Sequence, residues 1–136
     1  AMASTCYLEM LSPEDIFFSG NAQQIILPAI DGSHGILPGH EPMVTVITAG
    51  ELRFQDEKGE WHMAVITDSC VEIMPERVIL LAASIERPEE IDINRALAAK
   101  RRAEERLRQK QSQQEYYQTQ AALSRALARL KSRGRE

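Results

Sequence analysis

Aromatic residues and long apolar runs are both scarce in this 136-residue sequence, in which Tyr, Phe and Trp together make up 5%. No apolar run approaches the roughly 20 residues that a membrane-spanning helix needs. The N-terminal residues also lack the basic stretch and apolar segment of a secretory signal. We therefore expect a cytoplasmic protein without a membrane-inserted segment.

Cysteine is nearly absent as well, with only Cys6 and Cys70 present. Two cysteines are too few for a disulfide framework and do not have metal-ligand spacing, so reduced structural thiols are expected. With 43% hydrophobic and 26% charged residues, the composition is that of an ordinary soluble protein. The length is sufficient for one domain and a small appendage.

Glycine and proline are missing between Pro88 and Gly134, where Ala, Leu, Arg, Gln, Glu and Lys dominate. These are the best helix formers. Asp92 is the expected N-cap of a first helix. The apolar stripe of this helix is predicted to consist of Ala96, Ala99, Ala103 and Leu107.

A second helix is predicted to begin at Ser112, because Ser112 and Glu115 have the spacing of a capping box. Its apolar side is predicted to consist of Tyr116, Leu123, Leu127 and Leu130. Two helices with such stripes pack antiparallel, so residues 88–136 are expected to form a hairpin that is only weakly stable by itself.

Residues 1–87 contain eight short runs of β-forming residues, separated by turn formers such as Ser19-Gly20-Asn21 and Ala49-Gly50. The runs are 7–11, 15–19, 22–27, 44–48, 51–55, 61–67, 70–74 and 77–85. Tightly joined strands run antiparallel, which predicts an antiparallel β-sandwich or barrel. The run from Arg77 to Ala83 is almost wholly apolar, which predicts a central strand with both faces covered. The fold class is thus α+β.

The two parts differ in charge. Residues 1–90 contain four basic and fifteen acidic residues, a formal charge of −11, whereas residues 91–136 contain twelve basic and five acidic ones, a formal charge of +7. The basic hairpin is expected to attract an anionic partner. Composition alone leaves nucleic acid, nucleotide, acidic lipid and an acidic protein surface as candidates.

The densest cluster of special residues extends from Asp31 to Pro42 and contains two histidines. The spacing of His34 and His40 matches no common metal motif. Ser33 adjoins His34 and lacks a nucleophile-elbow sequence, which disfavours a hydrolase. The glycines are expected to permit tight turns with positive φ, and the prolines to stiffen a protruding loop that suits docking.

The segment Gly35-Ile36-Leu37-Pro38-Gly39-His40-Glu41-Pro42, preceded by Asp31-Gly32, resembles the hallmark loop of the epsilon subunit of bacterial and chloroplast rotary ATP synthases. The segments 28–32, 49–53 and 91–96 resemble other parts of that family, and the resemblance extends from Tyr7 to about Leu130. It implies a β-sandwich of about ten strands followed by a two-helix hairpin.

The resemblance also implies a function. The chain would be a non-catalytic central-stalk subunit of a proton-translocating F-type ATP synthase, peripheral to the cytoplasmic side of the cell membrane. Its partners would be the gamma subunit, the ring of c subunits and, with the hairpin extended, the alpha/beta catalytic hexamer, where it inhibits ATP hydrolysis. By position, the contact with the c-ring would involve Asp31, Gly32, Ser33 and His34, next to the family loop residues Gly35, Pro38, Gly39 and His40.

In some members of that family the folded hairpin binds ATP, and the matching positions here are Glu86, Asp92, Arg95, Arg102, Arg125 and Arg129. Helical spacing brings Asp92, Arg95 and Arg102 within about 80° of one another. Arg125 and Arg129 lie one turn apart on the second helix, so four guanidinium groups can converge on a polyphosphate. The carboxylates would accept hydrogen bonds from base or ribose. The sequence has no Gly-rich phosphate loop, so we expect ATP to be a regulatory ligand and not a catalytic cofactor. No metal site is assigned.

Two other classes of function compete with this interpretation. A basic-hairpin adaptor would bind nucleic acid or an acidic protein surface, although the hairpin has no interleaved aromatics apart from Tyr116 and Tyr117, so no nucleic-acid partner is expected. A small hydrolase or metal enzyme centred on His34 and His40 would lose its activity on His40→Ala.

Overall fold

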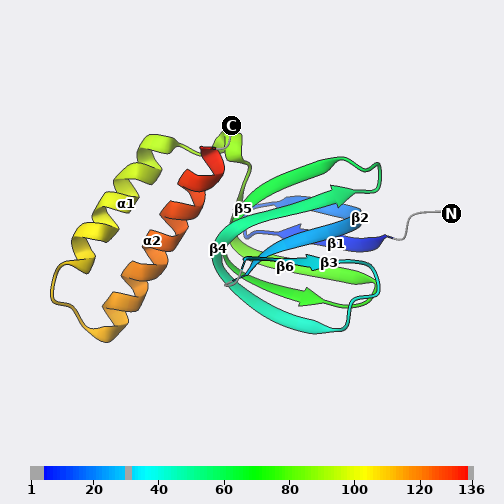
Figure 1. The fold of residues 1–136 in the computed structure, drawn as a ribbon, viewed down its shortest axis with the longest axis horizontal. Helices are drawn as coiled ribbons and strands as arrows, with labels where there is room; N and C mark the ends of the chain where they lie inside the picture. The colour runs from blue at the N-terminus through cyan, green and yellow to red at the C-terminus, as the bar shows by residue number, and fades with distance from the viewer. Residues whose placement is uncertain (1–4, 30–31, 135–136) are drawn as a thin grey trace.

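The computed structural model describes residues 5–29 and 32–134, which form a β domain and a helical hairpin beside it (Figure 1). The strands are β1 (Cys6–Leu11), β2 (Ile16–Ala29), β3 (Gly32–Ile36), β4 (Met43–Asp56), β5 (Trp61–Ile73) and β6 (Arg77–Glu86). The helices are η1 (Pro88–Glu90), a short 3-10 turn, α1 (Ile93–Leu107) and α2 (Gln113–Arg133). Figure 1 shows α2 between α1 and the strands.

In the described ranges the six strands form one sheet in the order β1-β6-β5-β4-β2-β3, and the sheet closes because β1 also pairs with β2. Neighbouring strands are antiparallel except for β1 and β6, which are parallel, with Tyr7 opposite Arg77 and Leu11 opposite Leu81. The expected α+β fold, with a β-sandwich followed by two helices, is confirmed. The parallel pair is an addition to the antiparallel pattern expected from the sequence.

The strands are longer and fewer than the sequence suggested, because three expected breaks lie inside strands, in β2, β4 and β5. Gly32–Ile36, expected to be part of a protruding loop, instead forms β3 by pairing with β2. Gly20 is within β2 and Gly50 is within β4. A Cβ atom on Gly50 would lie 2.6 Å from both Cβ and Cγ of Pro28. Glycine is therefore required at position 50 because β2 and β4 approach closely, and not because the chain reverses there.

The core lies inside the closed sheet, and its buried side chains alternate along β1, β6 and the second half of β5, whereas residues 64–67 of β5 are buried in succession. Its largest fully buried side chains include Phe54, which packs against Phe18 with ring centroids 4.5 Å apart. The other large members are Leu8, Met10, Ile25, Ile36, Leu52, Ile66, Ile73 and Leu80. Where the alternation holds, it fixes the register, since a slip by one residue would turn the apolar set outward.

The expectation that Arg77–Ala83 has both faces covered is wrong. In β6, Val78, Leu80 and Ala82 are buried, whereas Leu81 is 53% exposed. The helices do not cover this face, because α2 packs mainly against β4 and β5. One apolar face of β6 is therefore open to solvent.

Both predicted helix caps are present. The Asp92 carboxylate accepts a hydrogen bond from the backbone N–H of Arg95, and the Ser112 hydroxyl accepts one from the backbone N–H of Glu115. The predicted stripe of α1 is partly confirmed, because Ala96 and Ala103 are buried.

The predicted apolar side of α2 is only partly correct. Tyr116 is 42% and Leu127 is 45% exposed, and the buried positions of the helix are Thr119, Ala126 and Ser132. Small side chains fill the buried face because α2 packs closely between α1 and the sheet.

Candidate functional site

Two arginines of α2 hold the hairpin on the β domain. The Arg129 Nε donates to Glu86 Oε1 at 2.6 Å, and its Nη2 donates to Ser84 Oγ at 3.4 Å. The Arg125 Nη1 lies 3.3 Å from both carboxylate oxygens of Asp68. We call the pairs Arg129–Glu86 and Arg125–Asp68 the hairpin latch. The first pair is partly shielded from water, with the Arg129 and Glu86 side chains only 26% and 29% exposed, whereas Asp68 of the second pair is 49% exposed.

Asp68 has an unusual backbone conformation that contributes to the latch. Its φ is +47°, the only positive φ of a residue other than glycine in the described part of the chain. Thr67 and Ser69 pair with β4 and β6 on either side of it, whereas Asp68 pairs with neither strand. Aspartate tolerates this left-handed conformation better than most residues. The resulting kink in β5 presents the carboxylate to α2.

The candidate residues on α1 lie apart from the latch. Asp92 caps the helix, and the side chains of Arg95 and Arg102 are exposed. Arg102 lines an open groove of about 290 Å³ between the two helices, together with Arg106 and Glu115. An ion pair at 3.1 Å between Arg106 and Glu115 joins the helices there.

The structure thus brings together part of the six-residue set expected from the sequence. Glu86 contacts Arg129 directly, and Asp92 contacts the backbone of Arg95. Within the described residues, the side chains of the two α1 arginines form no hydrogen bond or ion pair with those of the two α2 arginines. The α1 arginines are Arg95 and Arg102, and the α2 arginines are Arg125 and Arg129. Sequence reasoning missed Asp68 and Ser84 as partners of the α2 arginines.

The loop after β3 is rigid. Gly39 has φ +85°, as expected for a glycine in a tight turn, and its N–H donates to the carbonyl oxygen of Pro75 at 2.7 Å. The His40 N–H donates to the carbonyl oxygen of Leu37 at 3.2 Å. The first bond ties the loop to the turn between β5 and β6, and the second closes a turn within the loop. Gly35, which pairs with Ile26 in the sheet, has open space where a Cβ would be.

The residues predicted to contact the c-ring lie just before this loop. The backbones of Gly32, Ser33 and His34 form the first part of β3 and pair with β2. Asp31 lies outside the described residues, as do the side chains of Ser33 and His34.

An apolar row crosses the outer face of the sheet. Val46 lies opposite Cys70, Cys70 opposite Leu81, and Leu81 opposite Leu11, so the four side chains share one face of β4, β5, β6 and β1. Val46 is 75% and Leu81 is 53% exposed. On the same face Val44, which is 65% exposed, lies opposite Glu72. Exposed apolar side chains that are contiguous across several strands are characteristic of docking surfaces.

The two cysteines differ in their surroundings, and both are free. Cys6 is 2% exposed, and burial raises the pKa of its thiol. Cys70 is exposed in the apolar row.

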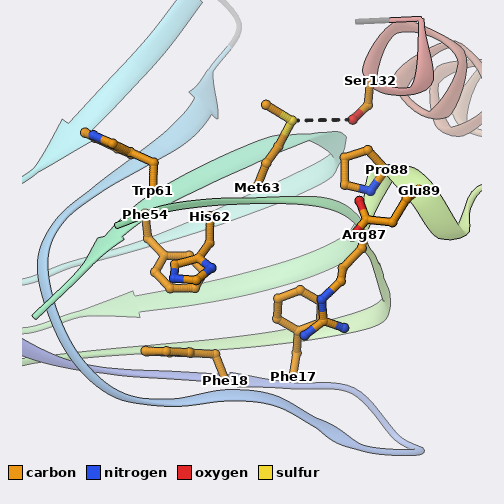
Figure 2. A pocket seen from close by; sticks show the side chains of 10 residues that line it. All are labelled: Phe17, Phe18, Phe54, Trp61, His62, Met63, Arg87, Pro88, Glu89 and Ser132. Atoms are coloured by element: carbon orange, nitrogen blue, oxygen red, sulfur yellow. Dashed lines mark hydrogen bonds between the residues drawn. The ribbon is translucent and has the colours of Figure 1, made fainter. Parts of the chain in front are cut away.

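A cavity of about 440 Å³ lies where the β domain meets η1 and the end of α2 (Figure 2). The His62 ring stacks on Phe54 with centroids 4.9 Å apart, and the guanidinium of Arg87 lies 4.5 Å above the Phe17 ring. At the rim, the Ser132 hydroxyl donates to Met63 Sδ at 3.8 Å. The sequence did not predict this cavity, because its lining residues are spread from Phe17 to Ser132.

Together these features describe a protein of two parts. A closed β domain exposes an apolar row for docking, and a basic hairpin is held against that domain by ion pairs. None of the helices in the described ranges has the length and apolar content needed to cross a membrane.

The comparisons with known proteins identify the family. Residues 5–88 match the model of the ATP synthase delta/epsilon chain β-sandwich domain, and residues 89–132 match that of the delta/epsilon chain long α-helix domain. The chain therefore belongs to the family of ATP synthase delta and epsilon chains.

Two relatives show how far this similarity extends. The ATP synthase epsilon chain of Ruminiclostridium cellulolyticum is 48% identical, over 97% of this chain and 98% of its own length. The one from Caldicellulosiruptor saccharolyticus is also 48% identical, over 91% of this chain and 90% of its own length.

Solved structures share the fold at much lower identity. A chain in the Euglena gracilis mitochondrial ATP synthase, in a structure of OSCP, F1 and the c-ring, superposes with a TM-score of 0.77 at 20% identity, covering 94% of this chain and 81% of that one. A chain in the central stalk and c-ring structure of the Tetrahymena thermophila mitochondrial enzyme gives 0.70 at 12% identity, covering 98% and 99%.

Proposed function

We propose that this chain connects the gamma subunit of a proton-translocating ATP synthase to its ring of c subunits, and that its hairpin restrains ATP hydrolysis. The observation that carries the proposal is the similarity to epsilon chains over nearly the whole length of both proteins. Association with the complex would hold the chain at the cytoplasmic side of the cell membrane.

The apolar row is the proposed docking surface for gamma. Val46 and Leu81 are too exposed to contribute to the core, but burying them against a partner would be favourable by about 25 cal/mol per Å² of apolar surface. The segment Asp31–His34, beside the loop anchored at Gly39, is the proposed contact with the c-ring. A loop fixed by backbone hydrogen bonds loses little conformational entropy when it docks.

A direct test measures the binding of the full chain to purified gamma subunit. Val46→Asp and Leu81→Asp would each place a charge in the row and are expected to weaken binding by at least tenfold. Gln114→Asp, at an exposed position of α2 away from the sheet, introduces the same charge, is the control and should bind normally. Equal binding by all three variants would place the gamma contact elsewhere on the chain.

The regulatory part of the proposal concerns the hairpin. When it is docked, the latch holds α2 on the β domain; when it is released, its charge of +7 would draw it toward acidic surfaces of the catalytic hexamer. ATP would favour the docked form. Its phosphates would replace Glu86 and Asp68 as anionic partners of Arg129 and Arg125, while Arg95 and Arg102 approach from α1.

In this state Glu86 would turn from Arg129 toward the base or ribose. Asp92, whose carboxylate already caps α1, would be a further acceptor. Both are proposed contacts.

ATP binding is tested by calorimetry and thermal unfolding of the isolated chain with ATP, ADP and GTP. The decisive variant is Arg95→Ala with Arg102→Ala, because these arginines take no part in the latch and their loss leaves the hairpin docked. Arg101→Ala with Arg108→Ala removes the same charge from α1 and its C-cap and serves as the control. At a hundredfold excess over Kd, ATP should stabilise the wild-type and control chains by about 2.7 kcal/mol. If the decisive variant binds ATP as well as the control does, the nucleotide site is not formed by these residues.

The adaptor alternative is not favoured by the structure. Several hairpin arginines already have carboxylate partners within the chain, among them Arg106, Arg125 and Arg129.

A further inference from the structure

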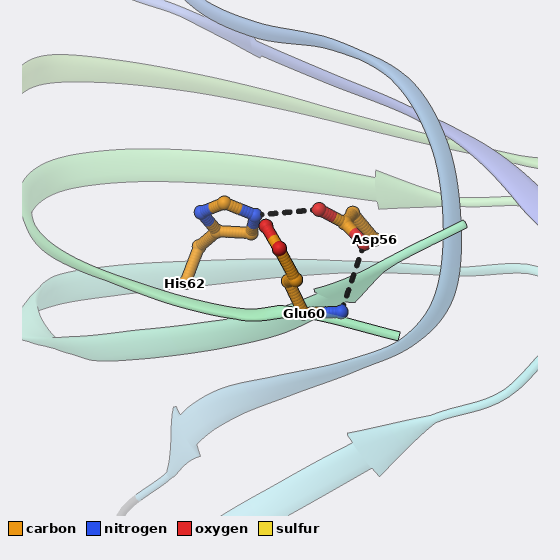
Figure 3. Close-up of side chains that lie close together, drawn as sticks. All are labelled: Asp56, Glu60 and His62. Atoms are coloured by element: carbon orange, nitrogen blue, oxygen red, sulfur yellow. Dashed lines mark hydrogen bonds and ion pairs between the residues drawn. The ribbon is translucent and has the colours of Figure 1, made fainter. Parts of the chain in front are cut away.

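A histidine and two carboxylates meet where β4 turns into β5 (Figure 3). Asp56 ends β4, Glu60 precedes β5, and His62 is the second residue of β5. One potential ligand atom from each of the three lies within 4.8 Å of the other two. The closest pair, His62 Nε2 and Asp56 Oδ2, is 2.8 Å apart.

The turn holds the Asp56 carboxylate in a fixed orientation. Its Oδ1 accepts hydrogen bonds from the backbone N–H groups of Lys58 and Glu60, each at 2.9 Å, which leaves Oδ2 directed at His62. The carboxylate is therefore an oxygen donor whose orientation is fixed by the turn.

The imidazole ring is immobilised as well. It stacks on Phe54 at an interplanar angle of 22°, and Phe54 itself is fully buried in the core. The ring plane is set by the core while Nε2 faces the carboxylate. Supporting contacts of this kind orient the ligands of metal sites in proteins.

We propose that Asp56, Glu60 and His62 bind a divalent transition-metal ion, for which Zn²⁺ is the best fit. Zinc accepts imidazole nitrogen and carboxylate oxygen at about 2.0–2.2 Å, and a tetrahedral arrangement separates its ligand atoms by about 3.3 Å. The present separations, from 2.8 Å up to at most 4.8 Å, bracket that value. The ion would replace the hydrogen bond between His62 and Asp56, and Glu60 would swing in as the third ligand.

Charge and access agree with this assignment. Two carboxylates and a neutral imidazole balance a divalent cation. Glu60 is exposed and the His62 side chain is 40% exposed, so an ion can enter and water can fill the fourth position. Mg²⁺ and Ca²⁺ prefer a larger number of oxygen ligands and should compete poorly with a zinc ion held by nitrogen.

A bound ion would connect the ends of β4 and β5 at the rim of the aromatic cavity, because His62 lines both sites. The site is separate from the hairpin latch and from the apolar row. It stands independently of the proposed function.

The test is a calorimetric titration of ZnCl₂ into the full, metal-free chain without an affinity tag. The exposed Cys70 thiol is another potential zinc ligand, so every variant carries Cys70→Ser. We expect one ion per chain. Glu60→Gln, an exposed position where the substitution does not threaten folding, should weaken binding by at least tenfold. Glu57→Gln removes the same charge from the same turn and should leave the affinity unchanged.

A second measurement identifies the nitrogen ligand. Addition of Zn²⁺ should shift the NMR resonances of the His62 ring and leave those of His40 in place. Absence of saturable binding would overturn the proposal, as would equal affinity in Glu60→Gln and Glu57→Gln, an unmoved His62 ring, or Mg²⁺ binding as tightly as Zn²⁺.

Discussion

Breaking the Arg129–Glu86 pair should release the hairpin from the β domain without unfolding the domain. The pair is a charge-assisted hydrogen bond of 2.6 Å between side chains about one-quarter exposed. Hydrogen bonds to charged groups contribute about 1.5–3 kcal/mol when shielded, and exposed ion pairs about 0.2–1 kcal/mol. We expect about 1.5 kcal/mol for this pair. The longer and more exposed Arg125–Asp68 pair should add about 0.5 kcal/mol.

The expected result is a shift in the docking equilibrium. Loss of both pairs, about 2 kcal/mol, would raise the population of the undocked hairpin about thirtyfold. A double-mutant cycle with Arg129→Met and Glu86→Gln isolates the contribution of the first pair. The assay is hydrogen exchange, which should accelerate for the amides of α2 and remain unchanged for buried positions of β5 such as Val71.

The control is Arg108→Met, because among the described residues Arg108 forms its ion pair with Glu105, in the same segment of the hairpin. About 1 M salt shortens the screening length to about 3 Å and should reduce the effect of the exposed Arg125–Asp68 pair most. A coupling energy below about 0.3 kcal/mol between Arg129 and Glu86, or an exchange rate in α2 no faster than in Arg108→Met, would refute the reasoning.

Three further predictions concern single positions. Gly50→Ala should destabilise the β domain by about 1–3 kcal/mol in chemical unfolding, because the added Cβ would overlap Pro28, whereas Gly35→Ala meets open space and should cost much less. A thiol reagent should modify one cysteine per native chain rapidly, because Cys70 is exposed while Cys6 is buried and its raised pKa keeps it protonated; a fast phase that persists in Cys70→Ser would contradict this. Ser112→Ala should lower hairpin stability by about 1 kcal/mol through loss of the N-cap of α2, measured by exchange at its first turn, and an equal effect of Ser124→Ala, at an exposed mid-helix position, would argue against a capping role.

The sequence predicted best what depends on neighbouring residues. The caps at Asp92 and Ser112 each join groups three residues apart, so the pattern contains the whole interaction. The same local reasoning misassigned Gly50 as a turn, because the residue that requires glycine there is Pro28, more than twenty positions away. The sequence did not predict the exposed face of β6, for a related reason. An apolar run does not reveal whether its outer side meets a helix of the same chain or is left for a partner.

The candidate site followed a similar rule. The resemblance to epsilon subunits predicted Glu86 and Arg129 as site residues. Their direct contact depends on where α2 packs, which the sequence does not show. Asp68 was missed entirely, since it lies 57 positions from Arg125 and its role arises from a kink in a strand. The one local signal was a charged residue between Thr67 and Ser69 in an otherwise β-forming run.

The parallel pairing of β1 with β6 sets an order of events during synthesis. Tyr7 pairs with Arg77, 70 positions further along the chain, and pairings over such separations form slowly because a long loop must close first. Until Arg77–Leu81 has left the ribosome, the edge of β1 that will meet β6 remains unpaired and open to other chains. The hairpin follows the six strands in the chain, so it emerges beside a sheet that can already be closed.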